Sequence, residues 1–286
     1  MYRPQSSPHG GHDKMRRRVA LALILVALPA LAAAPGREIV PGQRVRVQRL
    51  FRADKAQVYY PGRGTLWGGN LNTAIQYNYA QLRTATTELL RRYPADRSFF
   101  VGVGRSPAPL VAILQNLHPD LAINFPASGL SGRSGIDRRY LGEYHRHFAA
   151  FFPPEVIWGH RDIVLIDRSV GGHSIATLKW LLQEWLVGIG SKVQVRGVGF
   201  SNYISAKGVD RIDTQRFPVL SELLQEPFET WFGEFVGSHP IGLRRLEDLR
   251  RNSGYDHAKN LLRELMETDS HLDGELQNIP GIEVVP

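Results

Sequence analysis

The residues that could do chemistry gather in one short stretch of the sequence, residues 162–175. Four apolar residues, 163–166, lead into Asp167, and Gly171 and Gly172 follow shortly afterwards. An apolar run of this length is typical of a buried strand, and the hydroxyl residue after the glycines is typical of a helix start. Backbone N–H groups of such a loop, together with the N-terminus of the next helix, bind anions. The stretch therefore predicts a phosphate-binding loop between a strand and a helix.

A second loop of small residues follows another predicted strand, Ser98–Val103. Gly104 permits close approach of the backbone to a ligand, and Ser106 adds a hydroxyl. The guanidinium of Arg105 can hold a phosphate through two hydrogen bonds, although a surface ion pair is the simpler role for this side chain. Ligands of open α/β sheets bind beyond the carboxyl ends of the strands. We therefore expect the two loops to face each other across one site.

Strands and helices alternate around these loops, which predicts an α/β fold with a doubly wound parallel sheet and helical C-terminal additions. The predicted strands are Ser98–Val103, 121–125, 163–166 and 193–200, with shorter β-like pieces at 44–50 and 57–60. The predicted helices are 71–93, 107–117, 140–152, 174–186, 218–236, 243–252 and 257–266. A polar segment, 126–139, separates the second strand from the next helix, and loops of this length are usually mobile or functional.

The order of strand, acid, glycine loop and helix resembles the phosphoribosyl-diphosphate motif of the type I phosphoribosyltransferases. The similarity covers about residues 97–203 and includes a glycine-containing loop after the first core strand. The resemblance implies the sheet of that family and transfer of a phosphoribosyl group with release of pyrophosphate. It also implies Mg²⁺ as a cofactor if the protein is catalytically active.

The resemblance also assigns roles to residues. Asp167 takes the place of the catalytic acid that holds a ribose hydroxyl, although an Asp at this point can simply cap a turn. The 5′-phosphate loop consists of Gly171, Gly172, His173 and Ser174, and the diphosphate loop consists of Gly104, Arg105 and Ser106.

Two positions depart from the family pattern. Ile166 stands where the first of two acids is expected, and Gly171 stands where a threonine is expected. Only one carboxylate of the family pair therefore remains to bind the ribose hydroxyls. Restoring an acid at position 166 is expected to test for lost activity, provided that the strand end tolerates the charge.

The chain is expected to be exported. Three arginines, 16–18, precede an apolar run, 19–28, and a small-residue segment, 30–34, which together have the order of a secretory signal. The apolar run is short for a membrane span, so no membrane association is expected after cleavage; a retained anchor is the alternative. Met1 and Met15 are both possible starts.

Four segments follow from this patterning. They are a polar extension with the signal at 1–34, an irregular segment and first helix at 35–96, the phosphoribosyltransferase-like core at 97–217 and a helical C-terminal region at 218–286.

Composition excludes several classes of site. The chain of 286 residues contains no cysteine, so disulfides, thiolate metal sites and cysteine nucleophiles are excluded. The net charge of +8 comes from scattered basic residues without a nucleic-acid-binding motif. No metal site is predicted, since His145 and His147 lack the spacing of ligands on one helical face.

Three functions remain open at this point. The favoured one is an exported phosphoribosyltransferase-like protein that binds a phosphorylated small molecule, either a ribose-phosphate or a nucleotide, with or without phosphoribosyl transfer. The second is a non-catalytic binding or interaction module on the same fold. The third and weakest is a secreted hydrolase, because the sequence lacks the G-x-S-x-G nucleophile pattern.

Overall fold

The computed structural model describes residues 39–52, 71–104, 106–125, 127, 130, 140–169, 171–213 and 253–286. The predicted signal, the β-like piece at 57–60, Arg105, most of the polar segment 126–139 and the predicted helices 218–236 and 243–252 lie outside these ranges. The described residues belong to one unit that spans 36–286.

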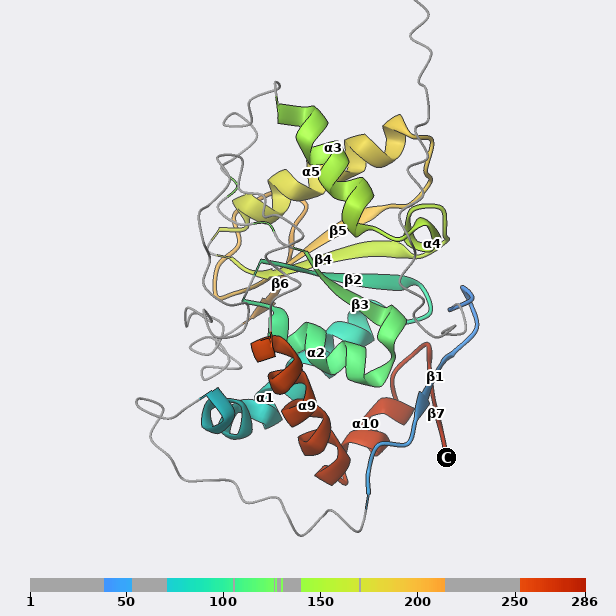
Figure 1. Ribbon diagram of the computed structural model, residues 1–286, viewed down its shortest axis with the longest axis vertical. Helices are drawn as coiled ribbons and strands as arrows, with labels where there is room; N and C mark the ends of the chain where they lie inside the picture. Colours follow the sequence, from blue (N-terminus) through green and yellow to red (C-terminus); the bar gives the residue numbers. More distant parts are fainter. Residues whose placement is uncertain are drawn as a thin grey trace, which may run out of the picture. The chain divides into compact units, whose positions relative to one another are not determined.

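Five parallel strands form the central sheet, in the order β3-β2-β4-β5-β6 (Figure 1). Their bounds are β2 Ser98–Val103, β3 Ala122–Phe125, β4 Asp162–Arg168, β5 Val195–Ser201 and β6 Asp210–Asp213. All six residues of β2 are buried. Continuous apolar runs of this kind are what a parallel strand covered on both faces requires.

One face of the sheet is covered by three helices, α3 Leu141–Phe151, α4 Pro154–Ile157 and α5 His173–Gly188 (Figure 1). Alternate strand residues point to this face, among them Val101 and Leu165, and pack with helix residues such as Phe148. This alternation follows from the period of two in a strand. The helices expected at 140–152 and 174–186 are therefore confirmed as α3 and α5.

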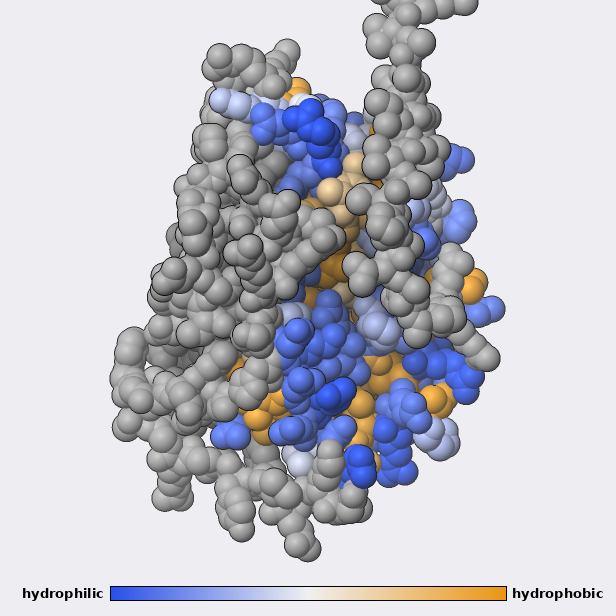
Figure 2. Space-filling view, viewed as in Figure 1, coloured by the Kyte–Doolittle hydropathy of each residue, from blue (hydrophilic) through white to orange (hydrophobic). Residues whose placement is uncertain are grey.

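The other face carries a larger helical layer. It contains α1 Leu71–Arg92, α2 Ala108–Leu117, the short 3₁₀ turn η1 Pro119–Leu121, α9 Ser253–Thr268 and α10 Leu272–Gln277. The intervening strand residues, including Phe100, Val164 and Ile166, pack into this layer. Figure 2 shows hydrophilic side chains over the outer surface of this layer, with apolar side chains between them.

A second, two-stranded sheet joins segments that are far apart in the sequence. β1 Val45–Gln48 pairs in parallel with β7 Ile282–Val285, and Val45 lies opposite Ile282. The carboxylate of Asp273 in α10 accepts hydrogen bonds from the backbone N–H groups of Leu50 and Phe51, each at 3.1 Å. This contact holds the segment after β1 against the C-terminal helices.

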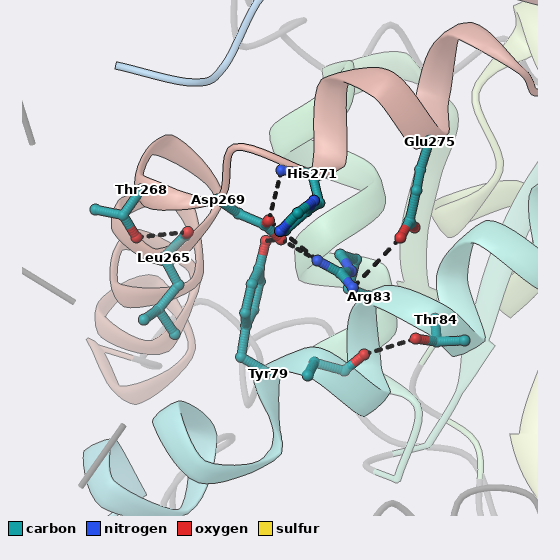
Figure 3. Close-up of polar contacts among 9 residues, drawn as sticks. Tyr79, Arg83, Thr84, Leu265, Thr268, Asp269, His271 and Glu275 are labelled. Carbon is teal, nitrogen blue, oxygen red and sulfur yellow. Dashed lines mark hydrogen bonds and ion pairs between the residues drawn. The ribbon is translucent and has the colours of Figure 1, made fainter. Parts of the chain in front are cut away.

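A polar cluster joins α1 to the turn between α9 and α10 (Figure 3). Arg83 donates from one terminal nitrogen to both carboxylate oxygens of Asp269, at 3.0 and 2.8 Å, and its other terminal nitrogen lies 3.3 Å from Glu275. Asp269 also accepts hydrogen bonds from the hydroxyl of Tyr79 and from the backbone N–H of His271. The carboxylate is therefore satisfied from three directions.

The structure confirms the α/β class, the parallel sheet and the presence of helices on both faces. The strands β6 and β7 and the helices α4 and α10 were not predicted. Within the described part of the chain, no helix has the length and apolar character needed to cross a bilayer.

Candidate functional site

The two predicted loops lie at the same edge of the sheet. β2 and β4 are parallel neighbours, with Gly102 opposite Ile166, and Gly104 and Asp167 follow these positions at the carboxyl ends. The chain leaves β2 for β3 on one side and returns to β4 on the other side. The edge between β2 and β4 is therefore the point where the strand order reverses, which is where open α/β sheets bind ligands.

Asp167 is the acid at this reversal point. It occupies the penultimate position of β4, opposite Gly199 of β5, and is half-buried. Burial raises the pKa of the Asp167 carboxyl well above its usual value, while the backbone N–H and the charge of Arg168 oppose this shift. A carboxyl with a raised pKa at a sheet edge is a candidate for binding or proton transfer.

Gly171 and Gly172 form the turn between β4 and α5, with φ angles of +81° and +79°. The N–H of Gly172 donates to the hydroxyl of Ser169 at 3.1 Å, and the N–H of Gly171 donates to the carbonyl of Tyr203 at 3.3 Å. Both N–H groups are therefore used within the protein. The turn shapes the loop, and the donors for a ligand must come from the next residues.

Those donors are at the start of α5. Gly172 is the N-cap residue and provides no side-chain oxygen, and the first helical bond runs from the N–H of Ala176 to the carbonyl of Gly172 at 3.0 Å. The N–H groups of the first helical turn, from His173 to Ile175, precede this bond and have no acceptor within a helix. A helix N-terminus with such donors attracts a phosphate group.

The side chains of His173 and Ser174 have different surroundings. The Ser174 hydroxyl donates to the carbonyl of Leu130 at 2.9 Å, so its single proton is already used. His173 is exposed, and its Nε2 lies 3.4 Å from the hydroxyl of Ser205. His173 is thus the one of the two side chains that faces solvent.

The first loop is described only in part. The N–H of Gly104 donates to the carbonyl of Phe125 at 2.9 Å, and a Cβ added to Gly104 would lie 2.8 Å from the carbonyl oxygen of Ala127. Glycine is therefore required where this loop passes the end of β3. Ser106 is half-buried just before α2, and Arg105 lies outside the described residues.

A third loop completes the site and was not singled out in the sequence. The residues after β5 cover the glycine turn: the carbonyl of Gly171 accepts hydrogen bonds from the N–H groups of Ser205 at 3.1 Å and Ala206 at 2.9 Å. Ile204 packs against Gly172, whose Cβ would lie 3.2 Å from its methyl group. The signal that could have found this loop is its position after the fourth predicted strand, at the same edge.

Ile166 does not face the site. Its side chain is fully buried in the layer of α1, α2 and α9, and Asp167 is the next residue along the strand. Successive strand residues point to opposite faces. A carboxylate at position 166 would therefore enter the apolar layer, which is unfavourable for the charge that the test for lost activity requires.

Metal-binding groups are sparse in the described part of the molecule. It contains no cluster of three or more His, Asp or Glu side chains that could hold a metal ion. His147 packs against the rings of Phe125 and Phe151, at 5.0 and 4.6 Å between centroids. Asp167 is the acid that β4 brings to the site.

No protein-family model matches the chain, and no curated protein or solved structure matches it. Function must therefore be inferred from the geometry of the site.

Proposed function

We propose that this protein binds a ribose-phosphate or a nucleotide at the sheet edge between β2 and β4, as type I phosphoribosyltransferases do. One observation carries the proposal. The carboxyl of Asp167 stands at the end of β4, and the glycine-capped N-terminus of α5 follows six residues later at the point where the strand order reverses. An acid for sugar hydroxyls and a helix N-terminus for a phosphate are thus offered by one loop.

The backbone determines how the phosphate is held. The N–H groups of His173, Ser174 and Ile175 are the donors in this proposal, because those of Gly171 and Gly172 already have acceptors. The exposed imidazole of His173 adds a further donor. Gly171 and Gly172 keep the loop in the left-handed turn that aims the helix at the ligand.

Phosphoribosyl transfer is the finer part of the proposal. The Gly104–Ser106 loop would take the diphosphate, and Mg²⁺ would neutralise its charge when bound. Mg²⁺ commonly uses one or two carboxylates together with substrate phosphates, so Asp167 fits this role with most ligands coming from the diphosphate. Asp167 itself would accept hydrogen bonds from a ribose hydroxyl and orient the sugar.

A non-catalytic binding protein is the alternative that a specific observation favours. Ile166 replaces the first family acid and packs into the apolar layer, so the site keeps one carboxylate. Incubation with phosphoribosyl diphosphate, Mg²⁺ and a mixture of nucleobases, followed by measurement of pyrophosphate, distinguishes the two functions. Release of pyrophosphate that requires a base supports transfer, and ligand binding without release supports the binding protein.

Export remains part of the proposal, because its sequence signal lies outside the described residues.

A crystal structure with ribose 5-phosphate tests the binding mode. We expect the phosphate within hydrogen-bonding distance of the N–H groups of His173 to Ile175 and a ribose hydroxyl on Asp167. A ligand bound elsewhere, or a sheet edge without ligand at millimolar concentration, would contradict the proposal.

A further inference from the structure

β1 has one edge that no described strand covers. The N–H groups of Val45 and Arg49 donate to carbonyls of the β7 segment, each at 2.7 Å. Alternate residues of a strand direct their N–H and C=O groups to opposite sides, so Arg44, Arg46 and Gln48 direct theirs away from β7. Among the described strands, β1 pairs with β7 alone. The backbone groups of the even-numbered residues therefore point away from β7. The strand pair lies at the lower right of Figure 1.

A groove of about 560 Å³ runs beside this strand. Its polar lining consists of Arg44, Arg46, His118, Gln43 and Gln48, and none of its described lining residues is acidic. Arg44 and Arg46 are both exposed, and neither side chain forms an ion pair with another described residue. Neither guanidinium group therefore has a carboxylate partner at ion-pair distance among the described residues.

His118 adds a hydrogen-bond donor to the groove. Its Nδ1 accepts a hydrogen bond from the N–H of Asp120 at 3.2 Å, which leaves Nε2 to carry the proton of the neutral ring. Burial lowers the pKa of His118, and the charge of Arg161 adds to this effect, whereas Asp120 opposes it. Glu283 of β7 lies opposite Arg46 in the register of the pair, outside the lining of the groove. The lining of the groove itself is basic.

We propose that the outer edge of β1 binds an extended acidic segment of a partner protein as an additional strand. Backbone N–H and C=O groups of Arg44, Arg46 and Gln48 would provide the main-chain hydrogen bonds, as in other cases of strand addition. Arg44 and Arg46 are two residues apart, about 6.6 Å along a strand, and alternate carboxylates of an extended segment have the same spacing.

The charge pattern selects this occupant over two others. A second copy of the chain would place arginines opposite arginines, which is unfavourable across strands. An apolar strand would bury guanidinium groups without partners, and charged residues on an edge strand oppose such pairing. An acidic segment satisfies both the open backbone and the two arginines.

The test uses the full chain and a fluorescein-labelled peptide of alternating Glu and Val, followed by fluorescence anisotropy. We expect saturable binding, at least tenfold weaker for the double variant Arg44→Glu/Arg46→Glu. The matched control Arg146→Glu/Lys192→Glu makes the same charge change at exposed residues elsewhere and should leave the affinity within about twofold. Circular dichroism of both variants establishes that they are folded.

A second arm does not depend on any variant. The same peptide with every backbone nitrogen methylated keeps its charge but has no N–H to donate along either edge, and we expect at least a tenfold loss of affinity. Equal affinity of the two peptides would overturn strand addition, as would no binding at 1 mM or an equal loss in the control variant. Dimerisation of the chain that Arg44→Glu/Arg46→Glu abolishes would also overturn the proposed occupant.

Discussion

Asp162 and Asp167 lie at opposite ends of β4 and have different surroundings. Asp162, at the amino end, accepts a hydrogen bond from Nε of Arg196 at 2.8 Å. Asp167, at the carboxyl end, lies beside the glycine turn of α5, and burial raises its pKa. The aspartate at the amino end of β4 thus belongs to a surface ion pair, whereas the aspartate at the carboxyl end belongs to the candidate site.

The raised pKa of Asp167 predicts that the free energy of unfolding depends on pH. The folded protein holds this proton more tightly than the unfolded chain, so stability falls as the pH rises from the unfolded pKa, near 4, through the folded pKa. Asp167→Asn removes this titration. We expect the variant to gain stability relative to the wild type as the pH rises from 4 to 8, measured by urea unfolding. A constant difference between the two proteins would contradict the assignment.

The two glycines that bound α5 should respond oppositely to alanine. Gly172 has a φ of +79°, and an added Cβ would press on Ile204, so Gly172→Ala should cost about 1–2 kcal/mol of stability. An added Cβ at Gly188 meets no atom within 4 Å, and Gly188→Ala should stabilise the protein by up to about 1 kcal/mol. Urea unfolding measures both; similar effects at the two positions would argue against the left-handed turn.

An acid at position 166 should damage the fold. Ile166 is fully buried, so Ile166→Asp loses apolar packing and introduces a carboxylate into the helical layer. We expect a loss of about 3 kcal/mol or more, compared with about 0.5–1.5 kcal/mol for Ile166→Val. Unfolding and pyrophosphate release are measured together; a stable Ile166→Asp variant with new transferase activity would contradict this orientation of β4.

The cluster around Asp269 should stabilise the attachment of α9 and α10 to α1 (Figure 3). Its carboxylate is 8% exposed and bonded to Arg83 and Tyr79. Asp269→Ala leaves Arg83 without this partner and should cost about 3 kcal/mol. Arg263→Ala, which removes an exposed hydrogen bond to the side chain of Asn260 on α9, is the control and should cost less than about 1 kcal/mol. Equal losses of stability in the two variants, measured by thermal or urea unfolding, would contradict the larger contribution that we assign to the buried cluster.

The sequence predicted those parts of the fold that local patterns encode. The apolar run of β4 and the glycines before α5 identified both elements and the loop between them. β6 was missed because only Ile212 of its four residues is fully buried. The pairing of β1 with β7 joins positions more than 230 residues apart, and no local pattern carries such a contact.

The candidate site was likewise predictable only where local patterns encode it. Asp167 and the glycine turn follow from their place after a strand, and their location at the same sheet edge as Gly104 follows from the parallel sheet. The use of the Ser174 hydroxyl by Leu130, and the covering of Gly171 by Ser205 and Ala206, depend on how separate loops pack. Tertiary contacts of this kind cannot be read from residue types and spacing.

The most direct test of the proposed ligand site is calorimetric titration with ribose 5-phosphate and inorganic phosphate at pH 8. Three proteins are compared: the wild type, Asp167→Asn and the matched control Asp162→Asn from the other end of β4. We predict that Asp167→Asn weakens the binding of ribose 5-phosphate by about 1.5–3 kcal/mol, which is a rise in Kd of about tenfold to 150-fold. The affinity for inorganic phosphate should change much less, and Asp162→Asn should bind both ligands with the affinity of the wild type. Equal affinity of all three proteins for ribose 5-phosphate, or no measurable binding by the wild type, would contradict a sugar-phosphate site at Asp167.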